Sequence, residues 1–300
     1  MSGLPLVELQ LPSPLVELQD DRLDAHDVRL LLKRDDLIHP ELPGNKWRKL
    51  KYNLVAARTA GHETLLTFGG AYSNHIRATA AAGYYGGFRT VGVIRGEEHH
   101  PLNPSLAYAV NRGMRLTYLD RSTYRAKHSE EVVERLGREF GNFYLLPEGG
   151  SNVEAVRGCA ELPVEIDEPF EVLFSAVGTG GTLAGIAGGL RANQRAVGIP
   201  ALKGGAFLAD EVEKLQRLAF GAPTDNWSLE CDYHFGGYAK RTAELGLFID
   251  NFRRRHALQL DWVYVAKMMY AVFAMIQRGE FANGTTIVAL VSGSDRIPQI

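Results

Sequence analysis

The sequence has few features of secreted, metal-stabilised or membrane-spanning proteins. Its only cysteines, Cys159 and Cys231, form no CxxC pair, and its histidines do not cluster at metal-ligand spacing. Neither a disulfide framework nor a structural zinc site is therefore supported, and we expect a cytoplasmic protein. No stretch reaches the roughly 18 apolar residues of a membrane-spanning helix, and the N-terminal segment lacks the pattern of a signal peptide. Export and membrane insertion are not expected.

A charge excess of either sign is also lacking. The formal net charge is -2, and charged residues make up 23% of the chain. Such a balance provides no extended basic field that would hold nucleic acid or an anionic membrane. We therefore expect neither partner, and any anionic ligand must be captured by a local site.

No flexible linker rich in Ser, Pro or Gly divides the 300 residues, of which 45% are hydrophobic. This length and composition allow one large α/β domain or two smaller domains that share an interface. The hexapeptide PLVELQ occurs at residues 5–10 and 14–19. A single short duplication does not make a repeat fold, and we interpret it as two short extended segments.

Short apolar runs alternate with helical patterns from residue 64 onward, which is typical of α/β proteins. Continuous apolar runs indicate strands covered by helices on both faces, as in a largely parallel sheet. The pattern predicts strands at residues 64–68, 90–94, 115–119, 142–146, 171–177 and 285–291. It predicts helices from about residue 74, at 104–112 and 122–140, from 151, and at 182–190, 242–256 and 267–278.

Three glycine-rich turns follow predicted strands, at residues 69–74, 148–152 and 178–182. The third is the strongest candidate anion site, because glycines let several N–H groups converge and the following helix adds positive charge at its start. A dinucleotide fingerprint would require glycine where Leu183 stands, and no Walker motif is present. A tight turn without a ligand is the alternative. The turn consists of Gly178, Thr179, Gly180, Gly181 and Thr182.

A run of cations, Lys46, Arg48 and Lys49, lies in the segment GNKWRK, ahead of a predicted helix. Such a run is usually solvated surface. A lysine that reacts with a carbonyl group must instead lose its proton near neutral pH, and nearby cations such as Arg48 and Lys49 favour that loss. Both interpretations stay open on the pattern alone.

Ser73 and Asn74 follow the strand predicted at residues 64–68. Capping of the next helix is the usual role of these residue types at such a place. A catalytic role for Ser73 would require a base that accepts its proton, for which Lys46 or a tyrosine is available.

Six segments, in order along the chain, resemble the 1-aminocyclopropane-1-carboxylate deaminase/D-cysteine desulfhydrase family: GNKWRKLKY, GGAYSNH, PEGGSN, AVGTGGTLAG, GIPALKGG and VYVAKMMY. The resemblance extends over about residues 32–293. It implies the tryptophan-synthase-β-like α/β fold (fold type II), with two open twisted parallel-sheet domains and pyridoxal 5'-phosphate between them. The expected division is a large cofactor-binding domain of residues 1–49 and 158–300, with a smaller domain, 50–157, inserted in it.

The resemblance also implies roles for individual residues. Lys46 is then the lysine that binds the cofactor covalently, and Lys49 and the turn at 178–182 hold its phosphate. Asn74 bonds its phenolic oxygen, while Ser73 lies beside the substrate as a nucleophile or proton-handling group. The substrate-binding residues implied by this match are Ser73, Asn74 and His75.

Tyr264 matches the family's active-site tyrosine, for which half-buried packing is the alternative. A second family tyrosine aligns to Phe235, which leaves Tyr233 and Tyr238 nearby, and we assign the role to Tyr238.

Two departures from the family pattern concern the chemistry. Val265 replaces the glutamate of deaminases and the threonine common in desulfhydrases, so deamination of the cyclopropane substrate is disfavoured. Ser292-Gly293-Ser294 replaces the usual Thr-Gly-Gly or Leu-Gly-Gly, and we expect Ser292 to bond the pyridine nitrogen of the cofactor. A neutral partner there suits eliminations and racemisations.

The sequence therefore predicts a homodimeric pyridoxal-phosphate-dependent lyase that eliminates a β-substituent from a small amino acid such as D-cysteine. Alternatives within the family are 1-aminocyclopropane-1-carboxylate deaminase and an amino-acid racemase. Alternatives outside the enzymes are a catalytically decayed cofactor-binding protein and a simple anion-binding module.

Overall fold

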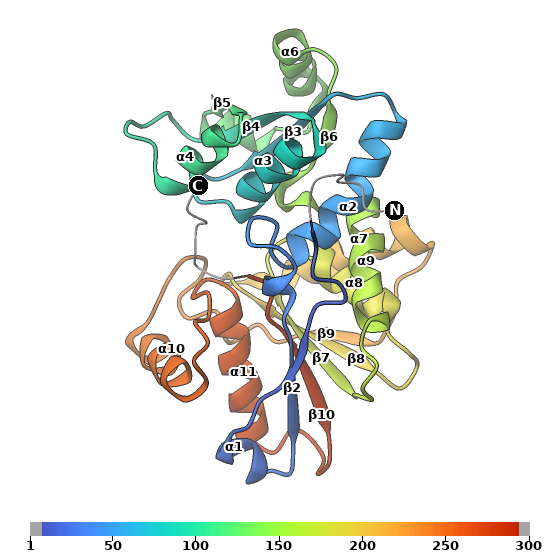
Figure 1. Cartoon of the computed structure of the whole chain (residues 1–300), viewed down its shortest axis with the longest axis vertical. Helices are drawn as coiled ribbons and strands as arrows, with labels where there is room; N and C mark the ends of the chain where they lie inside the picture. The colour runs from blue at the N-terminus through green and yellow to red at the C-terminus, as the bar shows by residue number, and fades with distance from the viewer. Residues whose placement is uncertain (1–7, 294–300) are drawn as a thin grey trace.

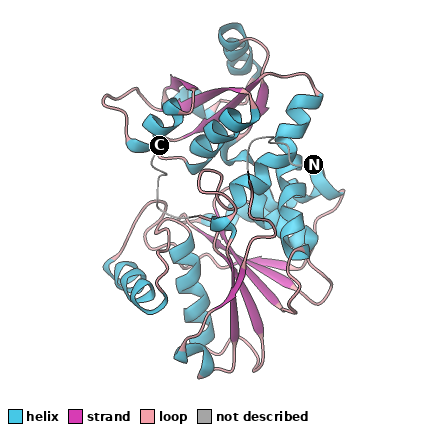
Figure 2. Cartoon of the chain, viewed as in Figure 1, coloured by secondary structure: helices cyan, strands magenta, loops and turns pink. Residues whose placement is uncertain are grey.

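The computed structural model describes residues 8–293, which form two β-sheets with helices on both faces (Figures 1 and 2). The large sheet contains, from edge to edge, β1 (Leu15–Glu17), β2 (Arg29–Lys33), β10 (Thr286–Leu290), β7 (Val172–Val177), β8 (Arg195–Pro200) and β9 (Trp227–Leu229). The small sheet contains, in the same manner, β5 (Met114–Leu119), β4 (Arg89–Arg95), β3 (Thr64–Gly69) and β6 (Tyr144–Leu146).

All neighbouring strands run parallel except β1 and β2, which pair antiparallel at one edge of the large sheet. The predicted α/β class with two open parallel sheets is therefore confirmed, with one antiparallel edge strand added. That edge strand is the second copy of the duplicated hexapeptide, whereas the first copy lies partly outside the described residues.

The long helices cover the sheets and fill the space between them (Figure 1). Those around the large sheet are α7 (Val153–Val164), α8 (Gly181–Gly189), α9 (Leu208–Phe220), α10 (Ala243–His256) and α11 (Val265–Gln277). Those around the small sheet are α2 (Asn45–Thr59), α3 (Asn74–Gly86), α4 (Pro104–Asn111) and α6 (Glu130–Phe140). Shorter helical segments are α1 (Asp21–Asp24), α5 (Arg121–Arg125), η1 (Asp35–Leu37), η2 (Glu148–Gly150) and η3 (Gly205–Phe207).

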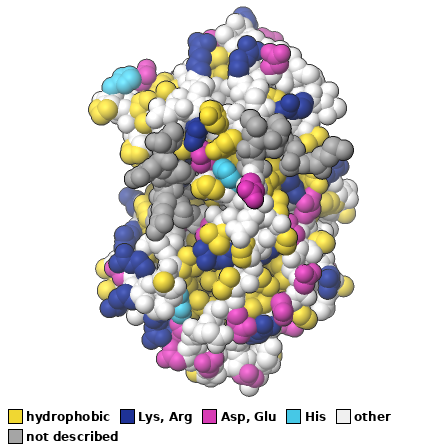
Figure 3. Space-filling model, in the orientation of Figure 1, with side chains coloured by type: hydrophobic (Ala, Val, Ile, Leu, Met, Phe, Trp, Pro, Cys, Tyr) yellow, Lys and Arg dark blue, Asp and Glu magenta, His cyan; other side chains and the backbone are white. Residues whose placement is uncertain are grey.

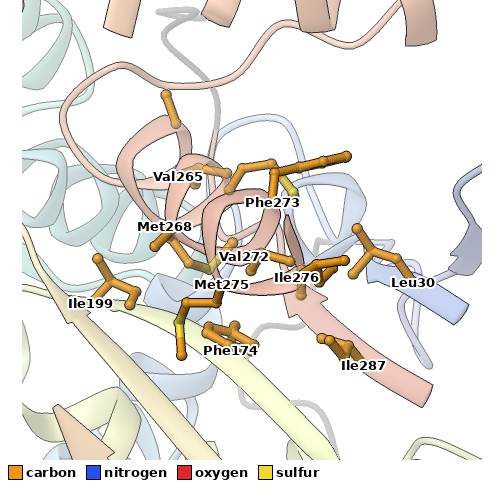
Figure 4. Close-up of a cluster of buried hydrophobic side chains, with 14 of the residues drawn as sticks. Leu30, Phe174, Ile199, Val265, Met268, Val272, Phe273, Met275, Ile276 and Ile287 are labelled. Atoms are coloured by element: carbon orange, nitrogen blue, oxygen red, sulfur yellow. The ribbon is translucent and has the colours of Figure 1, made fainter. Parts of the chain in front are cut away.

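Both faces of the large sheet are buried, because helices cover each of them. Successive strand residues point to opposite sides, so they enter different core clusters. Leu30 and Leu32 belong to the core cluster of α11, whereas Leu31 belongs to the cluster of α7, α8 and α9. Figure 4 shows the first of these clusters, in which side chains of α11 pack against Leu30, Phe174 and Ile287 of the sheet. This double cover accounts for the continuous apolar runs in the sequence.

The small sheet is covered in the same way. Leu65 packs with residues of α2 and α3, while its neighbour Leu66 packs with Tyr124 of α5 and Leu136 of α6. Helix α2 therefore belongs to the core of the small sheet along most of its length, although its first residues lie close to the large sheet.

Some predicted elements differ from the structure. The helix predicted at 122–140 is two helices, α5 and α6, because Asp120 caps the first and Ser129 caps the second. The run of cations does not precede a helix but forms the first turn of α2. Strands β2, β8 and β9 and helix α9 have no counterpart among the predicted elements.

All strands of the small sheet come from residues between 50 and 157, whereas those of the large sheet come from residues before and after this range. The expected boundaries themselves, at 49/50 and 157/158, fall inside α2 and α7, which lie side by side between the sheets. The exact limits of the domains stay a prediction.

The surface and the helices bear on the expected partners. In Figure 3, the visible face carries acidic and basic side chains interspersed at both ends of the molecule, so neither sign dominates it. Between residues 8 and 293, no helix is both long and apolar enough to cross a bilayer. Over the same residues, no group of three or more His, Cys, Asp or Glu side chains is placed to hold a metal ion.

A buried ion cluster joins α2 to the large sheet. The Arg48 guanidinium donates to both oxygens of Asp35, at 2.6 and 2.8 Å, and to both oxygens of Glu165, at 2.7 and 2.8 Å. The side chains of Arg48 and Asp35 are 1% and 0% exposed. The Lys33 ammonium lies 3.4 Å from Glu165 and donates to the backbone oxygen of Ser13 at 2.7 Å. The cluster thus connects β2, η1, α2 and the end of α7.

Removal of the guanidinium in Arg48→Met should destabilise the protein by about 3–5 kcal/mol, because it leaves buried carboxylates without their partner. The matched control is Arg217→Met, which breaks an exposed pair with Glu213 and should cost about 0–1 kcal/mol. Urea unfolding of both variants measures the difference. Equal losses would show that the Arg48 cluster contributes no more than a surface pair.

Candidate active site

The start of α2 lies at the carboxyl ends of the large-sheet strands, where ligands bind in open α/β sheets. Gly178 follows β7 and Ser292 closely follows β10, and these two strands are neighbours. Gly44, with φ +60°, fits so tightly that a Cβ there would lie 1.5 Å from the backbone oxygen of Ser292. Residues from both ends of the chain are therefore brought beside Lys46, two positions after Gly44.

Lys49 organises a set of hydroxyl groups at the glycine-rich turn. Its Nζ donates to the Ser151 hydroxyl at 2.9 Å and to the backbone oxygen of Gly149 at 2.9 Å, and lies 3.5 Å from the Thr179 hydroxyl. The hydroxyls of Ser151 and Thr179 are 2.6 Å apart. The predicted partners Lys49 and Thr179 are thus brought together. Ser151 was not predicted as a site residue, although it closes the glycine-rich turn at 148–152.

The N-terminus of α8 completes this anion site. Its cap is Gly180, which offers no side chain, and its first turn contains no acidic residue. Backbone N–H groups at such an end favour a phosphate. A Cβ on Gly181 would lie 2.6 Å from the Ser151 hydroxyl and 3.3 Å from Lys49 Nζ. The space between these groups is therefore open only because residue 181 is glycine. The Thr182 hydroxyl accepts a hydrogen bond from the Asn45 amide at 2.9 Å.

Lys46 is half-buried, and its Nζ donates to the Asn45 side-chain oxygen at 2.9 Å. Burial, reinforced by the positive charge of Lys49, lowers the pKa of Lys46 to about 7. A substantial fraction of its amine is then neutral near physiological pH, as a nucleophilic lysine requires. The expectation that Arg48 also supplies this bias is wrong, because the two carboxylates of the buried cluster neutralise its charge.

The start of α3 contributes Ser73, Asn74 and His75. Ser73 is the N-cap, and its hydroxyl oxygen accepts from the Ile76 N–H at 3.3 Å. The Asn74 side-chain oxygen accepts from Arg77. His75 is 2% exposed, and its Nε2 lies 2.9 Å from the Thr67 hydroxyl. Burial lowers the pKa of His75 well below its usual value, so the ring is neutral. Substrate contacts by Ser73, Asn74 and His75 stay a prediction.

Tyr264 lies beside the first glycine of the turn at residues 178–182. A Cβ on Gly178 would be 3.3 Å from its ring, and the ring of Tyr238 is centred 6.0 Å away. Burial, with a further contribution from Tyr238, raises the pKa of Tyr264 well above its usual value. The phenol therefore keeps its proton and can act as an acid or hydrogen-bond donor.

The three candidates for the second tyrosine position have different surroundings. Tyr233 is buried in the core cluster of α11, and Phe235 packs against Tyr270 at a centroid distance of 4.9 Å. Tyr238 alone among the three has a recorded ring contact with Tyr264. Its assignment to the site therefore has geometric support, although its role stays a prediction.

Val265 belongs to the hydrophobic core. Its side chain is 0% exposed and packs in the cluster of α11, beside Met268 in Figure 4. Its N–H donates to the Asp261 carboxylate at 3.1 Å, as does the N–H of Tyr264 at 3.0 Å. This position thus offers no polar side chain to the site.

The comparisons with known proteins agree with this arrangement. The chain belongs to the pyridoxal-phosphate-dependent enzymes, a family that matches residues 7–293. A Pyrococcus horikoshii protein provisionally named 1-aminocyclopropane-1-carboxylate deaminase is 32% identical over 262 residues, which cover 84% of this chain and 81% of the relative. The D-cysteine desulfhydrase of Klebsiella pneumoniae (strain 342) is 28% identical over 318 residues, covering 98% of this chain and 95% of the relative.

A solved structure described as a homologue of 1-aminocyclopropane-1-carboxylate deaminase has a TM-score of 0.84 and 30% identity to this chain. The match covers 97% of this chain and 92% of that structure. The predicted family, its fold type II architecture, its enzymatic nature and its cofactor are therefore confirmed.

The residues present fit pyridoxal 5'-phosphate. Lys49, Ser151, Thr179 and the start of α8 form a cradle of donors for the phosphate group, and a Cβ on Gly181 would fill it. Lys46 would supply an amine for the aldehyde, and Ser292 would supply a hydroxyl for the pyridine nitrogen. The assignment of each contact stays a prediction.

Burial and the charge of Lys49 together should determine the pH at which Lys46 reacts. Below its pKa the Lys46 amine is protonated and unreactive, so trapping of pyridoxal on Lys46 with cyanoborohydride should rise with a midpoint near pH 7. Lys49→Met removes a positive charge, which raises the pKa of Lys46 and moves the midpoint to higher pH. Pyridoxal lacks the phosphate, so loss of a phosphate contact does not confuse the result. Lys51→Met, two residues further along α2 at a lysine paired with Glu161, should leave the midpoint unchanged.

A methyl group added at Gly181 should weaken cofactor binding. The added Cβ would crowd Ser151 and Lys49, and overpacking of this kind costs about 1–3 kcal/mol. Titration of Gly181→Ala with pyridoxal phosphate, followed by visible absorbance, should show a matching increase in Kd. Gly137→Ala in α6, where a Cβ meets nothing within 4 Å, is the control and should bind normally. Unchanged affinity in Gly181→Ala would place the phosphate elsewhere.

Proposed function

We propose that the enzyme eliminates the β-substituent of a small amino acid, D-cysteine or a close relative. With cysteine, one molecule of water is consumed, and pyruvate, ammonia and hydrogen sulfide are released. Pyridoxal phosphate, when bound, withdraws electrons from the bonds of the substrate's α-carbon. Assembly as a homodimer and a cytoplasmic location stay predictions from the sequence.

The observation that carries the proposal is that two positions at which members of the family differ, 265 and 292, have uncharged side chains in this chain. Val265 is apolar and buried, so it cannot hold a polar group of the substrate or cofactor. Ser292, beside the Gly44 turn, offers a neutral hydroxyl rather than a carboxylate. A neutral partner leaves the pyridine nitrogen unprotonated, and such a ring suits reactions in which a leaving group removes the developing negative charge.

The proton transfers can be assigned to groups with suitable pKa values. Lys46, with its pKa lowered to about 7, would be able to accept the α-proton of a bound substrate. Tyr264 keeps its proton and can deliver it to the departing thiolate. The Ser73 oxygen accepts the Ile76 N–H, so its own hydrogen is directed elsewhere and can bond to the substrate.

Deamination of 1-aminocyclopropane-1-carboxylate is the second candidate, because the Pyrococcus horikoshii relative carries that name. That reaction would release 2-oxobutyrate and ammonia without sulfide. The two activities therefore give different products, and one assay distinguishes them.

Purified holoenzyme should convert D-cysteine to pyruvate and sulfide in equal amounts and should release no 2-oxobutyrate from the cyclopropane substrate. Ser73→Ala should lower kcat by about 10²- to 10⁴-fold while cofactor absorbance is retained, because it removes a proton-handling group. Ser129→Ala removes a serine cap from α6 instead, so it should lose only about 1 kcal/mol of stability and keep full turnover.

Formation of 2-oxobutyrate without any pyruvate from cysteine would overturn the proposed reaction. Full turnover in Ser73→Ala would remove Ser73 from the mechanism. Inversion of an amino acid without keto-acid release would identify a racemase.

A further inference from the structure

Lys267 is a buried cation that the proposed reaction does not use. Its side chain is 0% exposed, and its Nζ donates to three backbone oxygens: those of Ala201 at 3.0 Å, His234 at 2.8 Å and Gly237 at 2.8 Å. An ammonium group has three N–H donors, so all of them are engaged. Among its recorded hydrogen bonds none goes to a carboxylate, which distinguishes Lys267 from the buried Arg48.

Two of the three oxygens belong to a loop with an unusual backbone. Within five residues, φ is +50° at Phe235, +89° at Gly236, +119° at Gly237 and +51° at Ala239. Residues with a side chain rarely adopt positive φ, and such segments persist only where their surroundings hold them. The loop lies between β9 and α10 and contains only turns. The ammonium is therefore a principal contact that fixes it, since it binds the carbonyl groups on either side of Gly236.

The position of Lys267 connects this loop to the active site. Tyr264 is the N-cap of α11, and Lys267, three residues later, lies in the first turn of that helix. Tyr238 directly follows Gly237, whose oxygen Lys267 binds. The third oxygen, that of Ala201, directly follows β8 at the carboxyl edge of the large sheet. One ammonium thus joins the helix of Tyr264, the loop of Tyr238 and the end of a central strand.

We propose that Lys267 is a positioning residue that holds Tyr238 beside Tyr264 at the active site. The proposal rests on the proposed function, in which these phenols act at the substrate. Lys267 itself is not a proton carrier in this role, because each of its donors is committed to a carbonyl oxygen. Without the ammonium, the strained loop loses its common anchor, and Tyr238 moves away from Tyr264.

Lys267→Met in the holoenzyme tests the proposal with two independent readouts. The loop should become more accessible, so trypsin should cleave after Lys240 and Arg241 at least about tenfold faster. The value of kcat/KM should fall by about 10- to 100-fold, because displacement of a substrate-facing group by about 1 Å has effects of that size. Visible absorbance of the cofactor should be retained, since the phosphate cradle does not include this loop.

Lys33→Met is the matched control, because Lys33 is also a buried lysine, 1% exposed, that donates to a backbone oxygen, that of Ser13. It should lose stability without faster cleavage at the loop and without a change in kcat/KM. Gly237→Ala is a second route to the same state. At φ +119° a side chain is strained, although a Cβ would come no closer than 3.6 Å to Lys203, so the loop should be released with Lys267 intact.

Faster cleavage together with reduced kcat/KM in Lys267→Met or Gly237→Ala would support the proposal. Unchanged cleavage in both variants would overturn it, whatever the activity. Faster cleavage with unchanged kcat/KM would also overturn it, since the position of the loop would then have no effect on catalysis. Failure of the proposed function is seen separately, when the unsubstituted holoenzyme releases no pyruvate from D-cysteine.

Discussion

The structure depends on how positive charge is handled at the start of α2. Three cations, Lys46, Arg48 and Lys49, lie within the first five residues of α2, where the helix dipole is also positive and the first turn contains no acidic side chain. Arg48 is neutralised by the buried carboxylate of Asp35 and the partly exposed one of Glu165, whereas the hydrogen bonds of Lys46 and Lys49 go to neutral oxygens. The start of α8 adds further positive potential. A phosphate ester is the counter-charge that this region lacks, so cofactor binding also favours the folded state.

The candidate functional groups around these cations come from separate helices and strands, and each is held by contacts with nearby residues. Ser73 occupies a helix cap, Ser292 is held by a tight approach to Gly44, and Tyr264 begins a helix whose first N–H groups bond to Asp261. These three contacts share no residue. A family of enzymes built in this way can change one position, such as 265, and retain the binding of its cofactor.

Much of the fold could be predicted because its rules are local. Apolar runs indicate strands with two buried faces, and Ser73 marks the start of α3. The same rule was available at Ser129, whose capping role shows that the segment 122–140 is not one helix. Strand β9, with only three half-buried residues, is too short and too weakly apolar to stand out from the surrounding loops.

The site was less predictable because its contacts join distant parts of the chain. Arg48 and Lys49 are adjacent in sequence, yet the helix turns them toward different partners, Glu165 and Ser151, more than 100 residues away. No local sequence pattern shows which of the two cations pairs with a carboxylate and which donates to neutral oxygens. Family resemblance predicts Lys46 and Lys49 as cofactor-binding residues, but only the three-dimensional structure separates the cation that pairs with carboxylates, Arg48, from the two that do not.

The chain passes between the two sheets through helices that lie against each other, since α2 leads into the small sheet and α7 leads out of it. Contacts of Lys51 and Tyr52 with Glu161 fasten the two crossings together. A second group of contacts holds the small sheet outside these crossings, because Glu41, which precedes α2, accepts hydrogen bonds from Tyr85 at 2.8 Å and Arg112 at 2.6 Å. Lys49 of the first crossing and Ser151, just before the second, meet in the candidate phosphate cradle. Any shift of one crossing against the other would therefore alter the geometry of that cradle.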